Sequence, residues 1–211
     1  MITQTKLYQL EEKMREGLPG KGAQYRMAHV ARQTEYPIPD HARQAGVLAL
    51  FYPDLEKRWH LALIERVSHN PNDRHSGQIS FPGGRFEEED QTLLRTALRE
   101  TEEEIGVDTS SVKVLGALTD LYIPVSNYQV HPFVGILSHT PTFSPQWDEV
   151  QSIVETPLDI LCDPATRQRT DLRLSDHIVL KNVPFFNVSG KVIWGATAMM
   201  LSELLELLEE K

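Results

Sequence analysis

Three glutamates crowd the end of a segment that has the pattern of a helix. From residue 90 to residue 105, small and apolar side chains recur at helical spacing. At about 100° per residue they fall on one stripe that must face a core. Glu100, Glu103 and Glu104 share a different arc, because positions i, i+3 and i+4 are neighbours on a helix surface. Gly106 then ends the helix.

The alternative interpretation is that these glutamates simply form the solvent-exposed face of the helix. That interpretation leaves the placement of their negative charge unfavourable. Like charges at i and i+4 cost an isolated helix about 0.2–0.5 kcal/mol. The helix dipole disfavours an acid near the C-terminus by roughly 0.3–1 kcal/mol. A bound cation offsets this repulsion, and hard carboxylate oxygens suit Mg²⁺ or Mn²⁺. We therefore expect a divalent metal site whose ligands are Glu100, Glu103 and Glu104, with backbone carbonyls of Gly83 and Gly84 as further oxygen donors.

The surrounding sequence predicts the elements that must position this helix. Amphipathic helices are expected at both ends of the chain, at residues 2–16 and 197–208. Strands are expected at residues 45–52, 59–64, 112–118, 128–137 and 178–180, and residues 78–81 form a short apolar run before Pro82-Gly83-Gly84. The early strands are too close in sequence for helical crossovers, so we predict an α/β fold with a mixed sheet flanked by helices.

The division of the chain and its composition narrow the class of protein. A polar stretch with Pro37 and Pro39 separates a helical N-terminal extension, residues 1–40, from a main domain, residues 41–211, on which the extension packs. The chain has 21 Lys and Arg against 30 Asp and Glu, a net charge of −9 that argues against a nucleic-acid partner. The lone Cys162, the lack of a signal-peptide pattern and the lack of a membrane-spanning run predict a cytoplasmic protein. We expect Trp194 to lie in the core, and the alternative is that its ring stacks on an adenine base.

Residues 83–107 resemble the signature of the Nudix hydrolase family, in which a glycine and a spaced acid precede Arg-Glu-x-x-Glu-Glu-x-Gly and an apolar residue. Asp90 stands where the family usually has Glu, and one extra residue precedes Arg99. Both departures, and the run from Arg74 to Gly84, resemble the coenzyme A-directed branch of the family. The matching signature positions are Gly84, Asp90, Arg99, Glu100, Glu103, Glu104, Gly106 and Val107.

The resemblance implies a Nudix fold, which is an α/β/α sandwich around a mixed sheet. It also implies metal-dependent hydrolysis of coenzyme A or its thioesters to 3′,5′-ADP and 4′-phosphopantetheine or its acyl form. Arg99 would orient the carboxylates, and either Glu103 or Glu149 would act as the general base. The candidate substrate-binding residues are Arg66, Arg74, His75, Gln78 and Arg85.

Other functions are compatible with the same residues. The enzyme could act on ADP-ribose, a nucleotide sugar or another nucleoside diphosphate derivative. The chain could also be a non-catalytic nucleotide-binding module, or its acidic helix could bind a basic protein. We expect a small-molecule substrate, no nucleic-acid or membrane partner, and either a monomer or a homodimer.

Overall fold

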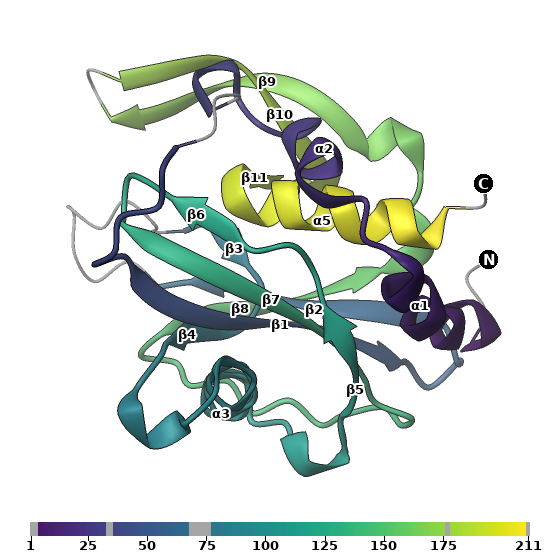
Figure 1. Ribbon diagram of the computed structural model, residues 1–211. Helices are drawn as coiled ribbons and strands as arrows, with labels where there is room; N and C mark the ends of the chain where they lie inside the picture. The colour runs from purple at the N-terminus through teal and green to yellow at the C-terminus, as the bar shows by residue number, and fades with distance from the viewer. Residues whose placement is uncertain (1–3, 33–35, 68–76, 176–177, 210–211) are drawn as a thin grey trace.

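The computed structural model describes residues 4–32, 36–67, 77–175 and 178–209. Its centre is an eight-stranded sheet (Figure 1). The strands of this sheet are β1 (Arg43–Pro53), β2 (Trp59–Arg66), β3 (Ile79–Ser80), β4 (Gly83–Arg85), β5 (Lys113–Ala117), β6 (Leu121–Ile123), β7 (Tyr128–Ile136) and β8 (Val150–Pro157).

The pairing of these strands makes the sheet mixed. The main path runs β3-β2-β1-β7-β5, with β8 beside β2, β4 beside β1 and β6 beside β7. Strands β1 and β2 are antiparallel, because only a short turn joins them, and Leu50 faces Ala62. Strands β1 and β7, far apart in sequence, are parallel, with Leu48 opposite Phe133. The predicted mixed sheet is therefore confirmed.

Helices cover both faces of this sheet, as Figure 1 shows. The helices in the two outer layers are α1 (Gln4–Glu16), α2 (Gly20–Tyr25), α3 (Leu93–Ile105) and α5 (Gly195–Leu208). Side chains of β1 alternate between the layers, as a strand requires. Leu48 and Leu50 pack in the cluster that includes Ala97 of α3, whereas Phe51 packs in the cluster that contains most of α5. The predicted α/β/α arrangement is confirmed.

Helix α3 begins three residues later than the sequence predicted. Thr92 is its N-cap, and its hydroxyl accepts a hydrogen bond from the backbone N–H of Arg95 at 3.2 Å. The acidic run before it forms a separate 3-10 turn, Glu88–Asp90. At the other end Gly106 has φ 69°, a left-handed conformation that glycine adopts without steric cost. The predicted stop at Gly106 is confirmed.

A second, three-stranded sheet follows the short helix α4 (Leu158–Leu161). Its strands are β9 (Arg167–Ser175), β10 (Ile178–Val188) and β11 (Lys191–Trp194). The expected strand at residues 178–180 is thus the start of a longer one, and β9 was not predicted because most of its residues are polar or charged.

The N-terminal segment shares the core of the rest of the chain. Leu7 and Leu10 of α1 lie in the same buried cluster as most of α5. The fully buried Glu203 of α5 accepts hydrogen bonds from the backbone N–H of Gly20 at 3.1 Å and from the Thr119 hydroxyl at 2.6 Å. The division into an extension, 1–40, and a domain, 41–211, stays a prediction. In the part of the chain that is described, no helix is both long and apolar enough to cross a membrane.

Candidate active site

A cleft of about 510 Å³ opens beside the C-terminal half of α3. We call it the central cleft, and its size is typical of small-molecule sites. Its polar lining includes Arg66, Gln78, Gly83, Gly84, Arg85, Glu100, Glu104 and Glu149. Its other wall includes Arg32, Ile123, Val125, Ser126, Tyr128, Val130, Trp194 and Met200.

Glu104 is the most deeply buried acid of the cleft, at 1% exposed. One carboxylate oxygen accepts the backbone N–H of Gly83 at 2.8 Å, and the other accepts Arg66 Nη1 at 3.2 Å. Burial raises the pKa of the Glu104 carboxyl from 4.5 to about 7, and these two partners oppose the rise only in part. The site therefore holds a carboxylate whose charge is poorly solvated.

Glu100 lies one helical turn before Glu104 and has a side chain that is 16% exposed. Burial raises its pKa, although Arg99 Nη2 lies 3.1 Å from its carboxylate. Gly84 makes room for this group, since a Cβ atom at Gly84 would overlap the Glu100 carboxylate. The negative charge of Glu149 raises the pKa of both Glu100 and Glu104. The three acids thus share one electrostatic environment.

Arg99 holds the acidic side chains around it. Its Nε donates to Asp90 Oδ1 at 2.7 Å, and its Nη1 donates to Glu103 Oε2 at 2.9 Å. The hydrogen bond from Arg99 holds the pKa of the buried Asp90 well below its ordinary range. Asp90 in turn accepts the Thr96 hydroxyl at 2.8 Å and so ties the 3-10 turn to α3. Arg99 therefore supports the cleft from outside its lining.

The donor chemistry of the cleft fits a hard divalent cation. Carboxylate oxygens are the ligands that Mg²⁺ and Mn²⁺ prefer, and Glu100, Glu104 and Glu149 provide them. A cation also offsets the mutual repulsion of these acids. Among the described residues, no three acidic, histidine or cysteine side chains lie close enough together to hold an ion as they stand. Both carboxylate oxygens of Glu104 are hydrogen-bonded, one to Arg66 and the other to the backbone N–H of Gly83.

The structure brings together most of the candidates that the sequence suggested, but not all. Arg66, Gln78 and Arg85 line the cleft with Gly83 and the acids. Glu103 does not line it, because Arg99 holds its half-exposed carboxylate elsewhere. Arg74 and His75 lie outside the described residues.

Several cleft residues were missed by the sequence reasoning. Ser126 and Tyr128 come from β6–β7, and Arg32 comes from the N-terminal segment. No local pattern marks them, because only the folded sheet brings them into the cleft. Trp194 was expected in the core, and this was wrong: it is half-buried and lines the cleft where α5 begins.

Comparison with known proteins identifies the class that this fold and cleft define. A family model described as the NUDIX domain matches residues 41–176. The chain therefore belongs to the Nudix family of hydrolases. Enzymes of this family use divalent metal ions and act on small nucleotide derivatives. The resemblance drawn from residues 83–107 is confirmed.

Particular relatives narrow the similarity further. An uncharacterized Nudix hydrolase, NudL, of Pectobacterium atrosepticum is 43% identical over 131 residues, which cover 62% of this chain and 67% of the relative. NudL of Yersinia pestis is 34% identical over 146 residues, 69% of this chain and 71% of the relative. Among solved structures, the Nudix hydrolase RenU of M. smegmatis superposes with a TM-score of 0.54 at 14% identity, covering 79% of this chain and 85% of that one. That likeness supports the fold.

Proposed function

We propose that this Nudix hydrolase cleaves the diphosphate bond of coenzyme A or of its thioesters. The observation that carries the proposal is the central cleft, in which three acids, Arg66 and Arg85 adjoin a wall that is mostly aromatic and apolar and also carries Arg32. Such a cleft can hold a charged diphosphate at one side and a less polar group at the other. The resemblance of the run from Arg74 to Gly84 to the coenzyme A-directed branch supports this substrate class. The products are 3′,5′-ADP and 4′-phosphopantetheine or its acyl form.

In this proposal the residues of α3 and β4 hold Mg²⁺ or Mn²⁺. Glu100 and Glu104 are the principal ligands, with the carbonyl of Gly83 and with Glu103 as further candidates. A bound divalent ion neutralises charge on the diphosphate oxygens and lowers the pKa of a coordinated water. Arg99 acts as a positioning residue, since its guanidinium fixes the carboxylates of Glu100 and Glu103.

Arg66, Arg85 and Gln78 are proposed to bind the substrate. Arg66 and Arg85 present cations to the same cleft as the acids, and a guanidinium matches phosphate oxygens well. Arg74 and His75, whose structure is not described, stay predicted contacts.

Glu149 is the better candidate for the general base. Its side chain is exposed and lines the cleft, and it has no cationic partner among the described residues. Glu103, by contrast, is held in an ion pair with Arg99. A base must reach the proton of the attacking water, which a carboxylate open to the cleft can do. The water oxygen then attacks phosphorus, the bridging P–O bond breaks, and Glu149 holds the proton that the water releases.

A hydrolysis panel tests the proposal directly. Coenzyme A, acetyl-coenzyme A, ADP-ribose and nucleoside triphosphates are incubated with the enzyme and Mg²⁺ or Mn²⁺, and the products are identified. Release of 3′,5′-ADP supports the proposal. Hydrolysis of ADP-ribose but not coenzyme A would assign another Nudix substrate, and tight binding without turnover would indicate a nucleotide-binding module.

Two substitutions test the residue roles. We expect Glu100→Gln and Glu149→Gln each to lower kcat by about 100-fold or more, because each removes a carboxylate from the cleft. Glu102→Gln is the matched control, since Glu102 is exposed on the same helix and does not line the cleft. Near-normal turnover of Glu100→Gln at saturating Mg²⁺ would refute the assignment of Glu100 as a ligand.

We also propose a cytoplasmic location for the protein, since a chain with a single cysteine fits a reducing compartment.

A further inference from the structure

Arg32 is a partly buried cation that ends the 3-10 turn Val30–Arg32. Its Nη2 donates to the backbone carbonyl of Tyr122 at 2.9 Å. Among the described residues it has no carboxylate partner, and burial lowers the pKa of its guanidinium. A guanidinium has five N–H donors, and burying them without acceptors costs free energy. The guanidinium of Arg32 is therefore placed to bind an anionic group that the described residues do not provide.

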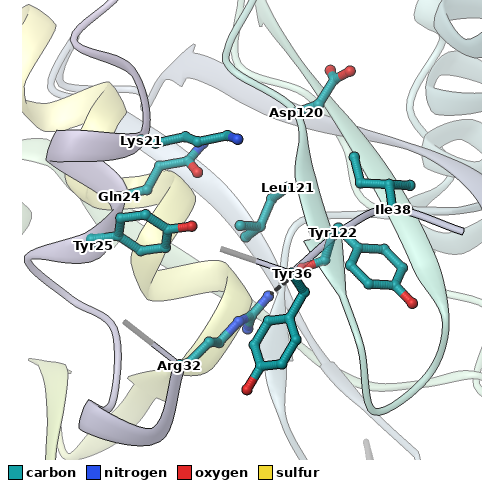
Figure 2. Close-up of a pocket in the computed structure, with 9 residues that line it drawn as sticks. All are labelled: Lys21, Gln24, Tyr25, Arg32, Tyr36, Ile38, Asp120, Leu121 and Tyr122. Atoms are coloured by element: carbon teal, nitrogen blue, oxygen red, sulfur yellow. Dashed lines mark hydrogen bonds between the residues drawn. The ribbon is translucent and has the colours of Figure 1, made fainter. Parts of the chain in front are cut away.

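The Arg32 side chain lies between two cavities. Arg32 lines the central cleft, and it also lines a smaller cavity of about 50 Å³ behind it. Figure 2 shows its guanidinium between the side chains of Tyr25 and Tyr36, with Lys21 on the far wall of the cavity. The residues that join Arg32 on this wall of the cleft, including Val125 and Tyr128, are uncharged, whereas Lys21 and Asp120 line the smaller cavity on its other side. Arg32 is thus the cation that this wall offers to a molecule in the cleft.

The sheet separates Arg32 from the diphosphate end of the cleft. Arg85 of β4 pairs with Ala45 of β1, Ala45 pairs with Val130 of β7, and Val130 pairs with Leu121 of β6. Neighbouring strands lie about 4.8 Å apart, so the backbones of β4 and β6 are roughly 14 Å apart. Arg32 is anchored on β6, whereas the acids gather beside β4. A group that binds Arg32 is therefore separate from a diphosphate that binds at the acids.

We propose that Arg32 binds a phosphomonoester group of the substrate, distinct from the diphosphate that is cleaved. The inference rests on the proposed function, under which this group is the 3′-phosphate of coenzyme A. The planar guanidinium matches phosphate oxygens in a two-pronged contact that lysine cannot reproduce. Arg32 lies outside residues 41–176, the part that matches the family model. The N-terminal segment thereby gives the cleft a specificity that the shared acidic helix does not determine.

Paired substrates test this contact in the active enzyme. Coenzyme A and 3′-dephospho-coenzyme A differ only in the phosphate in question. We expect Arg32→Gln to raise KM for coenzyme A by about 10- to 100-fold, with kcat little changed. The same variant should change KM for 3′-dephospho-coenzyme A by less than about threefold, because the contact is missing there in any case. Equal losses on both substrates would overturn the proposal and indicate a structural role.

A second variant and a matched control guard against trivial effects. Arg32→Lys keeps the charge and should raise KM for coenzyme A by only about 3- to 10-fold. If Arg32→Gln fails to fold, Arg32→Lys provides the same comparison, and equal effects on both substrates overturn the proposal. Arg95→Gln removes a positive charge from an exposed position of α3 that does not line the cleft. Its KM should change by less than about twofold. A rise in KM for coenzyme A equal to that of Arg32→Gln would indicate a general electrostatic effect of positive charge and contradict direct binding by Arg32.

Binding of the nucleotide product separates this inference from the proposed function. Calorimetry measures the affinity of the wild-type protein and of Arg32→Gln for 3′,5′-ADP and for AMP. We expect the wild type to bind 3′,5′-ADP about 10- to 100-fold more tightly than AMP, and the variant to lose that preference. This outcome supports the role of Arg32 even if coenzyme A is not hydrolysed, in which case only the proposed function fails. A wild type that binds both nucleotides equally refutes the inference, whatever the hydrolysis panel shows.

Discussion

Replacing Glu104 by Gln should make the metal-free protein more stable while it abolishes activity. The Glu104 carboxyl is 1% exposed, and burial raises its pKa from 4.5 to about 7. A carboxyl with a raised pKa binds its proton more tightly in the folded state than in the unfolded state. Its unfavourable effect is therefore absent below about pH 4.5, grows as the pH rises from 4.5 to 7, and is complete above 7. At about 1.4 kcal/mol per pH unit, this change corresponds to about 3 kcal/mol.

Urea unfolding in the presence of a chelator measures this difference. At pH 8 we expect Glu104→Gln to exceed the wild type in free energy of unfolding by about 3 kcal/mol. At pH 5, where most of the wild-type carboxyl is protonated in the folded state, the difference should be less than about 1 kcal/mol. Added Mg²⁺ should stabilise the wild type at pH 8 more than the variant, because the variant lacks a ligand. Turnover of the variant should fall by about 100-fold or more.

Glu102→Gln is the control for this experiment. Glu102→Gln removes an exposed carboxylate from the same helix and should change the free energy of unfolding by less than about 0.5 kcal/mol at either pH. If Glu104→Gln is no more stable than the wild type at pH 8 without metal, burial does not strain this carboxylate as we argue.

Three further predictions concern the support of the cleft. Gly84→Ala places a methyl group against the Glu100 carboxylate, so kcat at saturating Mg²⁺ should fall by about tenfold or more with the fold retained by circular dichroism. Asp90→Asn leaves Arg99 without its strongest partner and should lower the free energy of unfolding at pH 7 by about 2–4 kcal/mol, measured with urea. Because the Asp90 pKa is lowered in the folded state, its contribution is present above about pH 3.9 and is lost as the pH falls further, so the acid limb of wild-type stability should be steeper than that of the variant. Glu203→Ala leaves several buried donors without an acceptor and should cost about 3 kcal/mol, with the N-terminal helices becoming the first site of limited proteolysis.

Each of these predictions can fail in its own way. Normal turnover of Gly84→Ala would mean that Glu100 can move aside without harm. An Asp90→Asn variant with the same acid limb as the wild type would remove the salt bridge with Arg99 from the account of stability. Unchanged stability of Glu203→Ala would show that water replaces the carboxylate at no cost. The N-terminal helices would then be held by their apolar contacts and by other polar contacts, such as the hydrogen bond from Lys13 Nζ to the Leu207 carbonyl at 2.8 Å.

The sequence by itself determined the acidic helix and the class of fold around it. Residues four apart lie one turn apart in any α-helix, so Glu100 and Glu104 had to share a face once the helix was predicted. Gly106 stops the helix because it adopts the left-handed region. The short connection between β1 and β2 allowed only an antiparallel pair, which made a mixed sheet the natural prediction. These features depend on residues close together in the sequence, so they can be predicted from the sequence alone.

Only the tertiary structure decided which groups meet in the cleft. Glu103 shares an arc with Glu100, yet the ion pair with Arg99 holds it outside the lining. Glu149 reaches the same acids from the start of β8, and Arg32 approaches from a turn that no spacing rule connects to them. Their positions depend on pairing between strands far apart in sequence and on packing of the N-terminal helices against α5. Such contacts depend on the packing of many buried side chains from distant parts of the chain, and no short stretch of sequence predicts them.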